Sequence, residues 1–255
     1  MNIKKWLLKT CVCMWQFLRI VGGVVLLGAF LYFIYLMVVS PRGSEGLEEK
    51  AAQPICGRLS GKTLVVPRSY VVFWAEYEGE STWDKNTFHK NTGCDANFIS
   101  LPMVVTWPSF QSVDHSKYFR DGLGFDGLEV VVTPMFHNEF YLRARRDAFL
   151  GNSTGQQVEG ASYIDGLGLY LVKRRDNTFP EILNEYYWSE EEGEVQAVFE
   201  CLGNHKDVGV YSCRGEFLLG QLDALIKIGF TPEKLSDWKS IAVLTKEFVL
   251  SKVAN

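Results

Sequence analysis

The stretches Glu194–Leu219, EVQAVFECLGNHKDVGVYSCRGEFLL, and Leu222–Phe230, LDALIKIGF, decide the fold. Apolar and polar residues alternate through Glu194–Leu202, Val210–Leu219 and Leu222–Phe230, which is the period of a strand with one buried face. A polar turn, Gly203–Gly209, separates the first two runs. We therefore expect an antiparallel hairpin followed by a third strand.

An amphipathic helix is predicted to follow these strands. Thr231 can cap a helix whose first position is Pro232, a residue favoured there because it lacks an N–H. Apolar residues and one threonine then recur at helical spacing, which places them along one side of the helix. They are Leu235, Trp238, Ile241, Thr245, Phe248 and Val249. The fold class predicted is α+β, with this C-terminal amphipathic helix packed on antiparallel sheet.

The chain ahead of these strands contains further strand-like runs. Leu59–Gly79 is rich in β-branched and aromatic residues and predicts two strands, and Phe98–Pro108 predicts another with irregular ends. Asp121–Pro134 and Asp165–Lys173 each predict a glycine-rich turn that leads into a strand. Asn138–Leu150 suits a short helix or a charged edge strand, and we favour the helix.

A membrane-spanning helix is predicted over Ile20–Val39, IVGGVVLLGAFLYFIYLMVV. This run carries no charge and, at about 1.5 Å per residue, matches the roughly 30 Å hydrocarbon core of a bilayer. Lys4, Lys5, Lys9 and Arg19 precede it with no acid among them, which predicts a cytoplasmic N-terminus. A cleaved signal peptide is the alternative, but the apolar run is longer than such peptides carry and a poor cleavage site follows it.

These predictions describe a single-pass membrane protein and divide the chain into four parts. Residues 1–19 form the cytoplasmic N-terminus and residues 20–39 the transmembrane helix. Residues 40–55 form a linker, and residues 56–255 an exported α+β domain. If that domain holds two subdomains, their boundary lies near residues 155–165.

Four cysteines follow the apolar run, at Cys56, Cys94, Cys201 and Cys213. An even number in an oxidising compartment predicts two disulfides, for which three pairings are possible. We favour the pairing of near neighbours, because each closed loop then stays within one half of the domain. The spacings do not suit zinc, since they contain neither a CxxC nor nearby paired histidines.

The charge of the chain restricts the class of partner. Leaving out the four basic residues before the apolar run, 22 Lys and Arg stand against 30 Asp and Glu, a formal charge of −8. This balance argues against nucleic acid and anionic lipid surfaces as partners and is compatible with a basic protein. Solubility alone explains most of these charges.

One stretch matches a catalytic pattern. Gly151–Gly155, GNSTG, has the GxSxG form of a serine-hydrolase nucleophile elbow around Ser153, with Asp165 and His205 following in the required order. The mechanism needs a buried strand before the serine and a helix after it, whereas polar sequence flanks this motif on both sides. We interpret it as a surface turn and keep a serine hydrolase as an alternative.

The remaining polar motifs have simpler explanations. Asp114, His115 and Ser116 are three residue types of a catalytic triad, but adjacent side chains diverge, which favours a polar loop. The four histidines show neither HxH nor HExxH spacing. We therefore predict no catalytic residue, no metal, no cofactor and no small-molecule substrate, and a protein that is not an enzyme.

An acidic strip interleaved with aromatic residues precedes the predicted hairpin. Exposed rings supply binding energy at protein interfaces while carboxylates steer a basic partner, so the strip is a candidate partner-binding surface. Its residues are Glu185, Tyr187, Trp188, Glu190, Glu191 and Glu192. The alternative is a solvated turn whose rings lie in the core.

Several stretches resemble periplasmic immunity proteins of bacterial type VI secretion clusters. They are VQAVFECL at Val195–Leu202, YSCRGEF at Tyr211–Phe217, LIKIGFTPEKLSDWKSIAVLTKEFV at Leu225–Val249, and CGRLSGKTLVVPRSY at Cys56–Tyr70. The likeness covers about a third of the chain, and its motifs are structural: strand-borne Cys201, the Ser212–Arg214 turn and the helix opening at Leu235.

This resemblance implies a protein anchored in the bacterial inner membrane. Its periplasmic domain, residues 56–255, binds and occludes a secreted effector toxin, frequently a phospholipase. A membrane-tethered adaptor or structural protein of the cell envelope shares all of these features and is the main alternative. A serine hydrolase that uses Ser153 is the second alternative.

Overall fold

The computed structural model describes residues 28, 32, 53–79, 92–121, 126–135, 140–151, 160–175, 182–204 and 209–254. Residues 52–255 group into one compact unit. Residues 1–19, most of the predicted linker, Ser153 and His205 lie outside the described residues.

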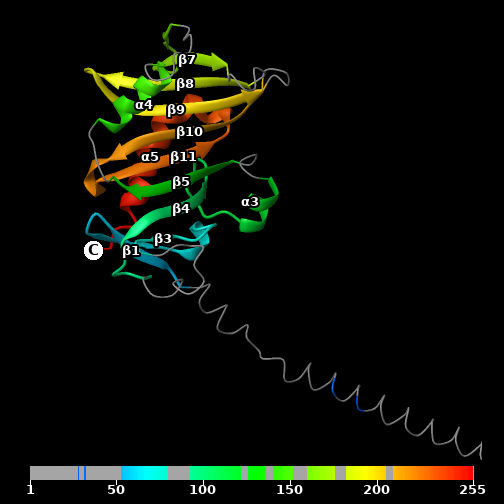
Figure 1. Ribbon diagram of the computed structural model, residues 1–255. Helices are drawn as coiled ribbons and strands as arrows, with labels where there is room; N and C mark the ends of the chain where they lie inside the picture. Colours follow the sequence, from blue (N-terminus) through cyan, green and yellow to red (C-terminus); the bar gives the residue numbers. More distant parts are fainter. Residues whose placement is uncertain are drawn as a thin grey trace, which may run out of the picture. The chain divides into compact units, whose positions relative to one another are not determined.

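A nine-stranded, fully antiparallel sheet organises this unit (Figure 1). The strand order across it is β3-β4-β5-β11-β10-β9-β8-β7-β6. The strands are β3 (Glu76–Tyr77), β4 (Phe98–Thr106), β5 (Gly127–Pro134), β6 (Ser162–Ile164), β7 (Leu169–Arg175), β8 (Ile182–Glu191), β9 (Glu194–Asn204), β10 (Gly209–Leu219) and β11 (Ala224–Phe230). Among the strands in the described part of the chain, β5 and β11 are the only neighbours distant in sequence, so their pairing joins the two halves of the sheet.

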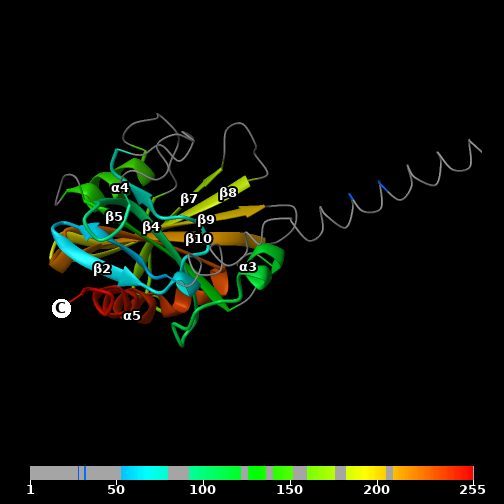
Figure 2. The ribbon, with the colours of Figure 1, turned by 90° about the horizontal axis from the view of Figure 1, so that it is seen from below.

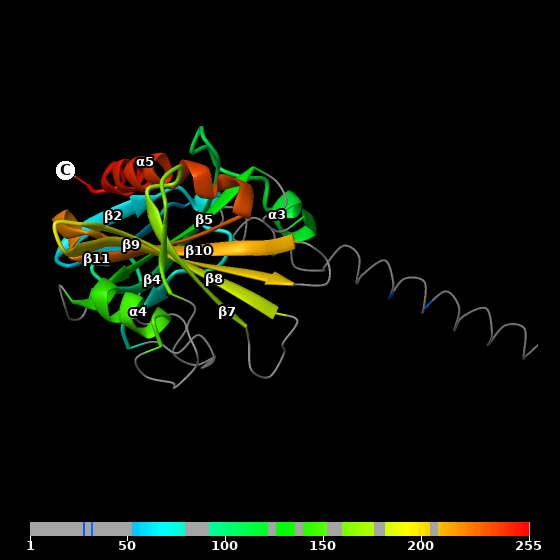
Figure 3. The ribbon, with the colours of Figure 1, turned by 90° about the horizontal axis from the view of Figure 1, so that it is seen from above.

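Shorter elements surround the sheet. A separate hairpin joins β1 (Ile55–Leu59) to β2 (Lys62–Val66). The described helices are α3 (His115–Asp121), α4 (Tyr141–Phe149) and α5 (Trp238–Leu250), with the 3-10 turns η1 (Arg68–Tyr70), η3 (Gly220–Leu222) and η4 (Pro232–Asp237). Figures 2 and 3 show α5 and α4 on opposite faces of the sheet.

Helix α5 covers the face of the sheet that forms the main core. Its chain begins as η4 directly after Thr231 and becomes α-helical at Trp238. The six residues predicted to line its apolar side are all buried. The Trp238 indole N–H donates a hydrogen bond to the Leu167 carbonyl at 2.8 Å, and its ring meets Phe199 edge to face at 5.5 Å between centroids. These contacts tie the helix to the β6–β7 turn and to the centre of the sheet.

Glycines allow two aromatic rings to lie flat within this core. A Cβ built on Gly57 would be 2.5 Å from the Phe98 ring, and one on Gly215 would be 2.6 Å from the Phe199 ring. Real Cβ contacts are longer than this, so any other residue would displace the rings.

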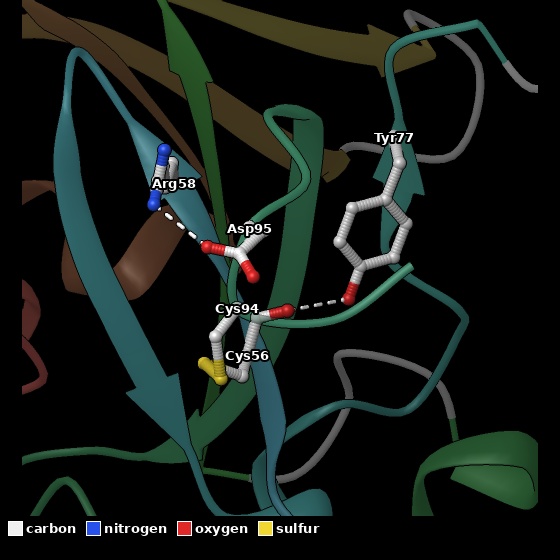
Figure 4. The surroundings of a disulfide bond; sticks show 5 residues. All are labelled: Cys56, Arg58, Tyr77, Cys94 and Asp95. Atoms are coloured by element: carbon white, nitrogen blue, oxygen red, sulfur yellow. Dashed lines mark hydrogen bonds and ion pairs between the residues drawn. A yellow bond between two sulfur atoms is a disulfide. The ribbon is translucent and has the colours of Figure 1, made fainter. Parts of the chain in front are cut away.

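The Cys56–Cys94 disulfide fastens the β1–β2 hairpin to the sheet (Figure 4). Beside it, the Arg58 guanidinium pairs with Asp95 at 2.7 Å, and the Tyr77 hydroxyl donates to the Cys56 carbonyl at 2.9 Å. The hairpin therefore covers one end of the core. The residues that it contacts, Asp95 and Tyr77, lie just before β4 and on β3.

The second disulfide, Cys201–Cys213, joins directly opposed residues of β9 and β10 and is buried. The prediction of two disulfides is confirmed, and both join near neighbours in the sequence. Each closes its loop within one half of the domain sequence, on one side of the β5–β11 pairing.

Two segments differ from the sequence-based prediction. The second strand expected within Leu59–Gly79 is largely absent: η1 and an irregular stretch replace it, and only Glu76–Tyr77 pairs with β4. Pro67, which has no N–H to give to a strand ladder, directly precedes η1, and Val71 and Val72 are buried in two different clusters. Most of the acidic strip is strand β8, whereas its alternative interpretation placed it in a solvated turn.

The predictions of a transmembrane helix over residues 20–39, of a fold class that included it, and of a single-pass inner-membrane location are corrected. A membrane-crossing helix needs about 20 apolar residues. Among the residues that the structure describes, no helix is long and apolar enough to cross a membrane. Within residues 20–39, only Gly28 and Tyr32 are described, and the rest lies outside the described residues. The architecture observed is mostly antiparallel β-sheet with a C-terminal helix.

Candidate binding surface

A groove lies on the face of the sheet opposite α5. Helix α4 covers part of this face, where Leu142 and Phe149 pack on Trp188 and Val198. Beside the helix, the sheet is hollowed over β5, β11, β10 and β9, with a volume of about 310 Å³. We call this hollow the sheet-face groove. The residues used below to describe it are Glu129, Arg145, Phe149, Glu200, Arg214, Glu216, Lys227 and Gly229.

Gly229 forms the floor of the sheet-face groove. It lies between Arg214 of β10 and Glu129 of β5 in the strand register. A Cβ at this position would be 2.8 Å from a carboxylate oxygen of Glu129 and 3.3 Å from its Cβ. The absence of a side chain therefore gives Glu129 the space to extend across the neighbouring strand.

Charged residues of opposite sign face each other across the groove floor. Arg214 is the register partner of Glu200, and Lys227 is the register partner of Glu216. Such cross-strand pairs are mildly favourable. Arg214 and Lys227 are exposed, whereas the two glutamates are half-buried, so the cations present their charge to a partner.

Phenol groups hold two of the groove carboxylates. Glu216 accepts hydrogen bonds from the Tyr141 hydroxyl at 3.0 Å and from the Arg145 Nε at 3.1 Å. Glu129 accepts one from the Tyr118 hydroxyl. Burial, and then the adjacent carboxylate, raise the pKa of both tyrosines. The two phenols donate these hydrogen bonds and so hold the carboxylates of Glu129 and Glu216 in place.

Helix α4 connects the groove to the turn between β8 and β9. Arg143 pairs with Glu194 at 2.8 Å, and Arg146 pairs with Glu190 at 2.8 Å. Arg145, between them in sequence, points instead to Glu216 in the groove. The helix thus uses three arginines to join the two surfaces.

The predicted partner-binding residues on β8 separate onto both faces of the sheet. Glu185 and Tyr187 lie on the face that α5 covers, whereas Trp188 lies under α4. Both rings are buried. The two rings therefore contribute to packing of the core.

The exposed part of the strip is the turn that joins β8 to β9. Glu191 and Glu192 are exposed there, beside the ion-paired Glu190 and Glu194. Glu192 and Gly193 both have positive φ, at 52° and 83°, as a tight hairpin turn requires. We call Glu190–Glu194 the acidic tip.

Glu185 is expected to make stability depend on acid pH. Burial would raise the pKa of Glu185, but the Lys173 ammonium at 2.6 Å and the Tyr187 hydroxyl at 2.6 Å outweigh it and leave the pKa below its usual value. Because its folded-state pKa is lowered, Glu185 stabilises the folded protein fully at pH values above its unfolded pKa of about 4.3. This contribution is lost as the pH falls through the folded-state pKa. Urea unfolding from pH 7 to pH 3 should show a smaller acid-induced loss in Glu185→Gln than in the wild type. An equal loss in both would contradict this.

Helix capping accounts for the triad-like residues Asp114, His115 and Ser116. One Asp114 carboxylate oxygen accepts hydrogen bonds from the Ser116 hydroxyl at 2.8 Å and the Ser116 N–H at 2.9 Å, at the start of α3. These bonds lower the pKa of Asp114, the hydroxyl bond most. The His115 ring contacts the Ser69 carbonyl at 3.1 Å instead of the serine. Among the described residues, no group of three or more His, Cys, Asp and Glu could hold a metal ion.

The groove was missed by sequence reasoning, although its residues leave a signal. Arg214 and Glu216 alternate with buried residues in SCRGEF, and Lys227 stands alone in the apolar LIKIGF. This period-2 pattern shows that one face of these strands is polar. The pairing of β5 with β11 brings further charged residues beside them. The local sequence pattern does not predict this pairing.

No protein-family model and no curated protein matches this chain. Two solved structures are similar to it. One is an immunity protein of the Stenotrophomonas maltophilia type IV secretion system, with a TM-score of 0.50 and 11% identity over 80% of this chain and 94% of that chain. The other is the iron-regulated outer membrane lipoprotein FrpD of Neisseria meningitidis, with a TM-score of 0.46 and 11% identity over 80% and 93%. At this identity, the first likeness establishes a shared fold.

Proposed function

We propose that this chain is an immunity protein. It binds a protein toxin of a bacterial secretion system and neutralises the toxin by occluding its functional surface. The observation that carries the proposal is the fold shared with a secretion-system immunity protein over nearly all of that protein's length. The sheet-face groove agrees with it, because two phenols and the Arg145 guanidinium hold two of its carboxylates in place, as a preorganised binding surface requires.

The identity of the toxin is a finer part of the proposal. The resemblance in the C-terminal strands and helix points to a type VI effector with phospholipase activity, whereas the similar solved structure comes from a type IV system. Our proposal takes the type VI phospholipase as the first toxin to test. Neutralisation by occlusion needs no catalytic residue on the immunity protein.

Co-expression with the secretion-system toxin encoded beside this gene tests the proposal. Full-length protein should restore growth and should co-purify with the toxin, while the toxin expressed alone should stop growth. If the chain neither rescues growth nor binds the toxin, and instead captures an endogenous envelope protein, the adaptor alternative is correct. Loss of rescue in Ser153→Ala with binding retained would support a hydrolase.

We expect the acidic tip to accelerate association with the toxin. Replacing both Glu191 and Glu192 by lysine should lower the association rate about tenfold at low salt, because exposed charges steer encounter more than they hold the complex. Surface plasmon resonance against the same toxin at 50 mM and 500 mM NaCl measures this. Glu247→Lys, on the exposed side of α5, is the control and should leave the rate near that of the wild type. An unchanged rate in the double variant at low salt would place the interface elsewhere.

A further inference from the structure

We propose that Arg174 of β7 binds a carboxylate of the toxin through two N–H groups that the free chain leaves unpaired. We call the edge of its guanidinium that carries Nε and Nη2 the Arg174 fork. This inference rests on the proposed function, because it names a chemical group on the same partner.

The Arg174 fork is buried without a partner. Both Nε and Nη2 are buried, and within the part of the chain that the structure describes neither atom has a hydrogen-bond partner. A buried polar group without a partner costs free energy, and a charged group costs more than a neutral one. Nearly all buried polar groups in folded proteins are therefore paired. The fork departs from this rule, and the packing of the free chain does not explain why.

The geometry of the fork favours a carboxylate. Nε and Nη2 lie on the same edge of the planar guanidinium and direct one N–H each to the same side. The two oxygens of one carboxylate match these two donors, and such bidentate pairs are among the strongest hydrogen bonds in proteins. On a protein partner, the matching group is the side chain of an aspartate or a glutamate.

The residues that face Arg174 do not supply a carboxylate. Its cross-strand partner is Asn184, whose amide oxygen is also buried and unpaired among the described residues. The guanidinium lies over the Tyr186 ring, 5.8 Å from its centroid. Glu200 is the register partner of Tyr186 on the next strand, and it pairs with Arg145 at 4.0 Å. No acid in the described ranges forms an ion pair with Arg174.

Arg174 extends the sheet-face groove towards β7. Val172, two residues earlier, packs with Trp188 under α4, so Arg174 lies on this face as well. Tyr186, beneath the guanidinium, is paired with Glu200, which lines the groove. A partner that covers the groove can therefore also reach Arg174. The fork lies below the surface of the free chain, so the side chain has to turn outward on binding, as interface side chains commonly do.

The acidic tip lies at the other end of β8. Asn184, opposite Arg174, is near the start of this strand and Glu191 is at its end, so roughly 20 Å separates them at the rise of a strand. A toxin that offers an acid to the fork and basic residues to the tip can bind in one direction only. The two charges therefore select the orientation of the partner and disfavour a partner of uniform charge.

Isothermal titration of the full chain with the toxin encoded beside the gene tests the fork. Arg174→Met should weaken the dissociation constant at least tenfold, because it removes charged hydrogen bonds. Arg174→Lys keeps the charge but cannot bind a carboxylate bidentately, so it should recover only part of the loss. Arg58→Met is the matched control and should bind as the wild type does. Arg58 is exposed, already pairs with Asp95, and lies on β1, which Figure 1 shows far from β7.

Urea unfolding of the free variants separates this role from a structural one. Because Arg174→Met removes an unpaired buried charge, it should unfold at the same urea concentration as the wild type or at a higher one. A lower midpoint would mean that the chain itself pairs the fork, and the inference would be wrong. If the wild type binds the toxin and Arg174→Met stays within threefold of it, the inference is also wrong and the proposed function stands. If the wild type neither binds nor neutralises the toxin, both are wrong.

Discussion

Replacing Trp238 by alanine is expected to lower the free energy of unfolding by about 3–5 kcal/mol, the range for removing a large ring from a packed core. Trp238 is the first α-helical residue of α5, and its ring packs against the Phe199 ring. The Phe199 ring in turn lies against Gly215. Its loss also leaves the Leu167 carbonyl without its hydrogen bond. The β6–β7 turn should therefore loosen together with the start of α5.

Urea unfolding of the full chain measures this change. The transition is followed by far-ultraviolet circular dichroism, which reports secondary structure and does not rely on tryptophan fluorescence. Val243→Ala is the control within the same helix and should change stability by less than about 0.5 kcal/mol, because its side chain is exposed. Trp238→Phe keeps most of the ring but cannot donate the hydrogen bond, so its cost should lie between the two. A cost below about 1 kcal/mol for Trp238→Ala would mean that α5 is not anchored at this residue.

Removing the Cys56–Cys94 disulfide is expected to cost about 4 kcal/mol, because the bond closes a loop between residues 38 positions apart. The chain-entropy estimate for Cys201–Cys213, whose residues are 12 positions apart, is smaller, at about 3 kcal/mol. The first bond also holds the β1–β2 hairpin, whose Leu59, Leu64 and Val66 are buried in the main core. Its removal should therefore allow the β1–β2 hairpin to unfold locally, in addition to lowering the global stability.

The double variant Cys56→Ala and Cys94→Ala, compared with Cys201→Ala and Cys213→Ala, tests the order of these effects by urea unfolding. Hydrogen exchange should show early loss of protection in Lys62–Val66 only when the first bond is removed. Because Cys94 is exposed and Cys213 is buried, mild reductant should also open the first bond before the second. The opposite order of reduction would contradict this account of the hairpin.

The sequence predicts best where one face of an element is apolar and its partners are near in the chain. The β9–β10 hairpin, β11 and the six buried positions from Leu235 to Val249 follow from local period and turn chemistry. The pairing of the four cysteines also follows, since each pair lies within one local unit. The preference for a helix over an edge strand in Asn138–Leu150 agrees with α4, whose two buried apolar residues, Leu142 and Phe149, lie two helical turns apart.

Features that depend on distant pairing were not predictable. Strand β8 has apolar residues on both faces, with Tyr187 under α5 and Trp188 under α4, so it shows no clean alternation. The sheet-face groove needs Glu129 beside Gly229, which are 100 positions apart and meet only through β5 and β11. The contact between the Phe73 and Phe119 rings likewise needs α3 to bring two distant segments together. The apolar run at residues 20–39 predicted a membrane helix from its composition alone, and the structure does not support that prediction.

The single seam between β5 and β11 has a consequence for how the chain acquires its structure. All other neighbours in the sheet are consecutive strands, so two meanders can form early from local contacts, and neither disulfide crosses between them. Joining residues about 95 positions apart is then the slow event, because loop-closure entropy precedes its contacts. During refolding, amides of β9 and β10 should gain protection before those shared by β5 and β11. Until β5 pairs with β11, the edge of β5 is unpaired. The rate of this pairing therefore determines how long the folding chain is vulnerable to aggregation.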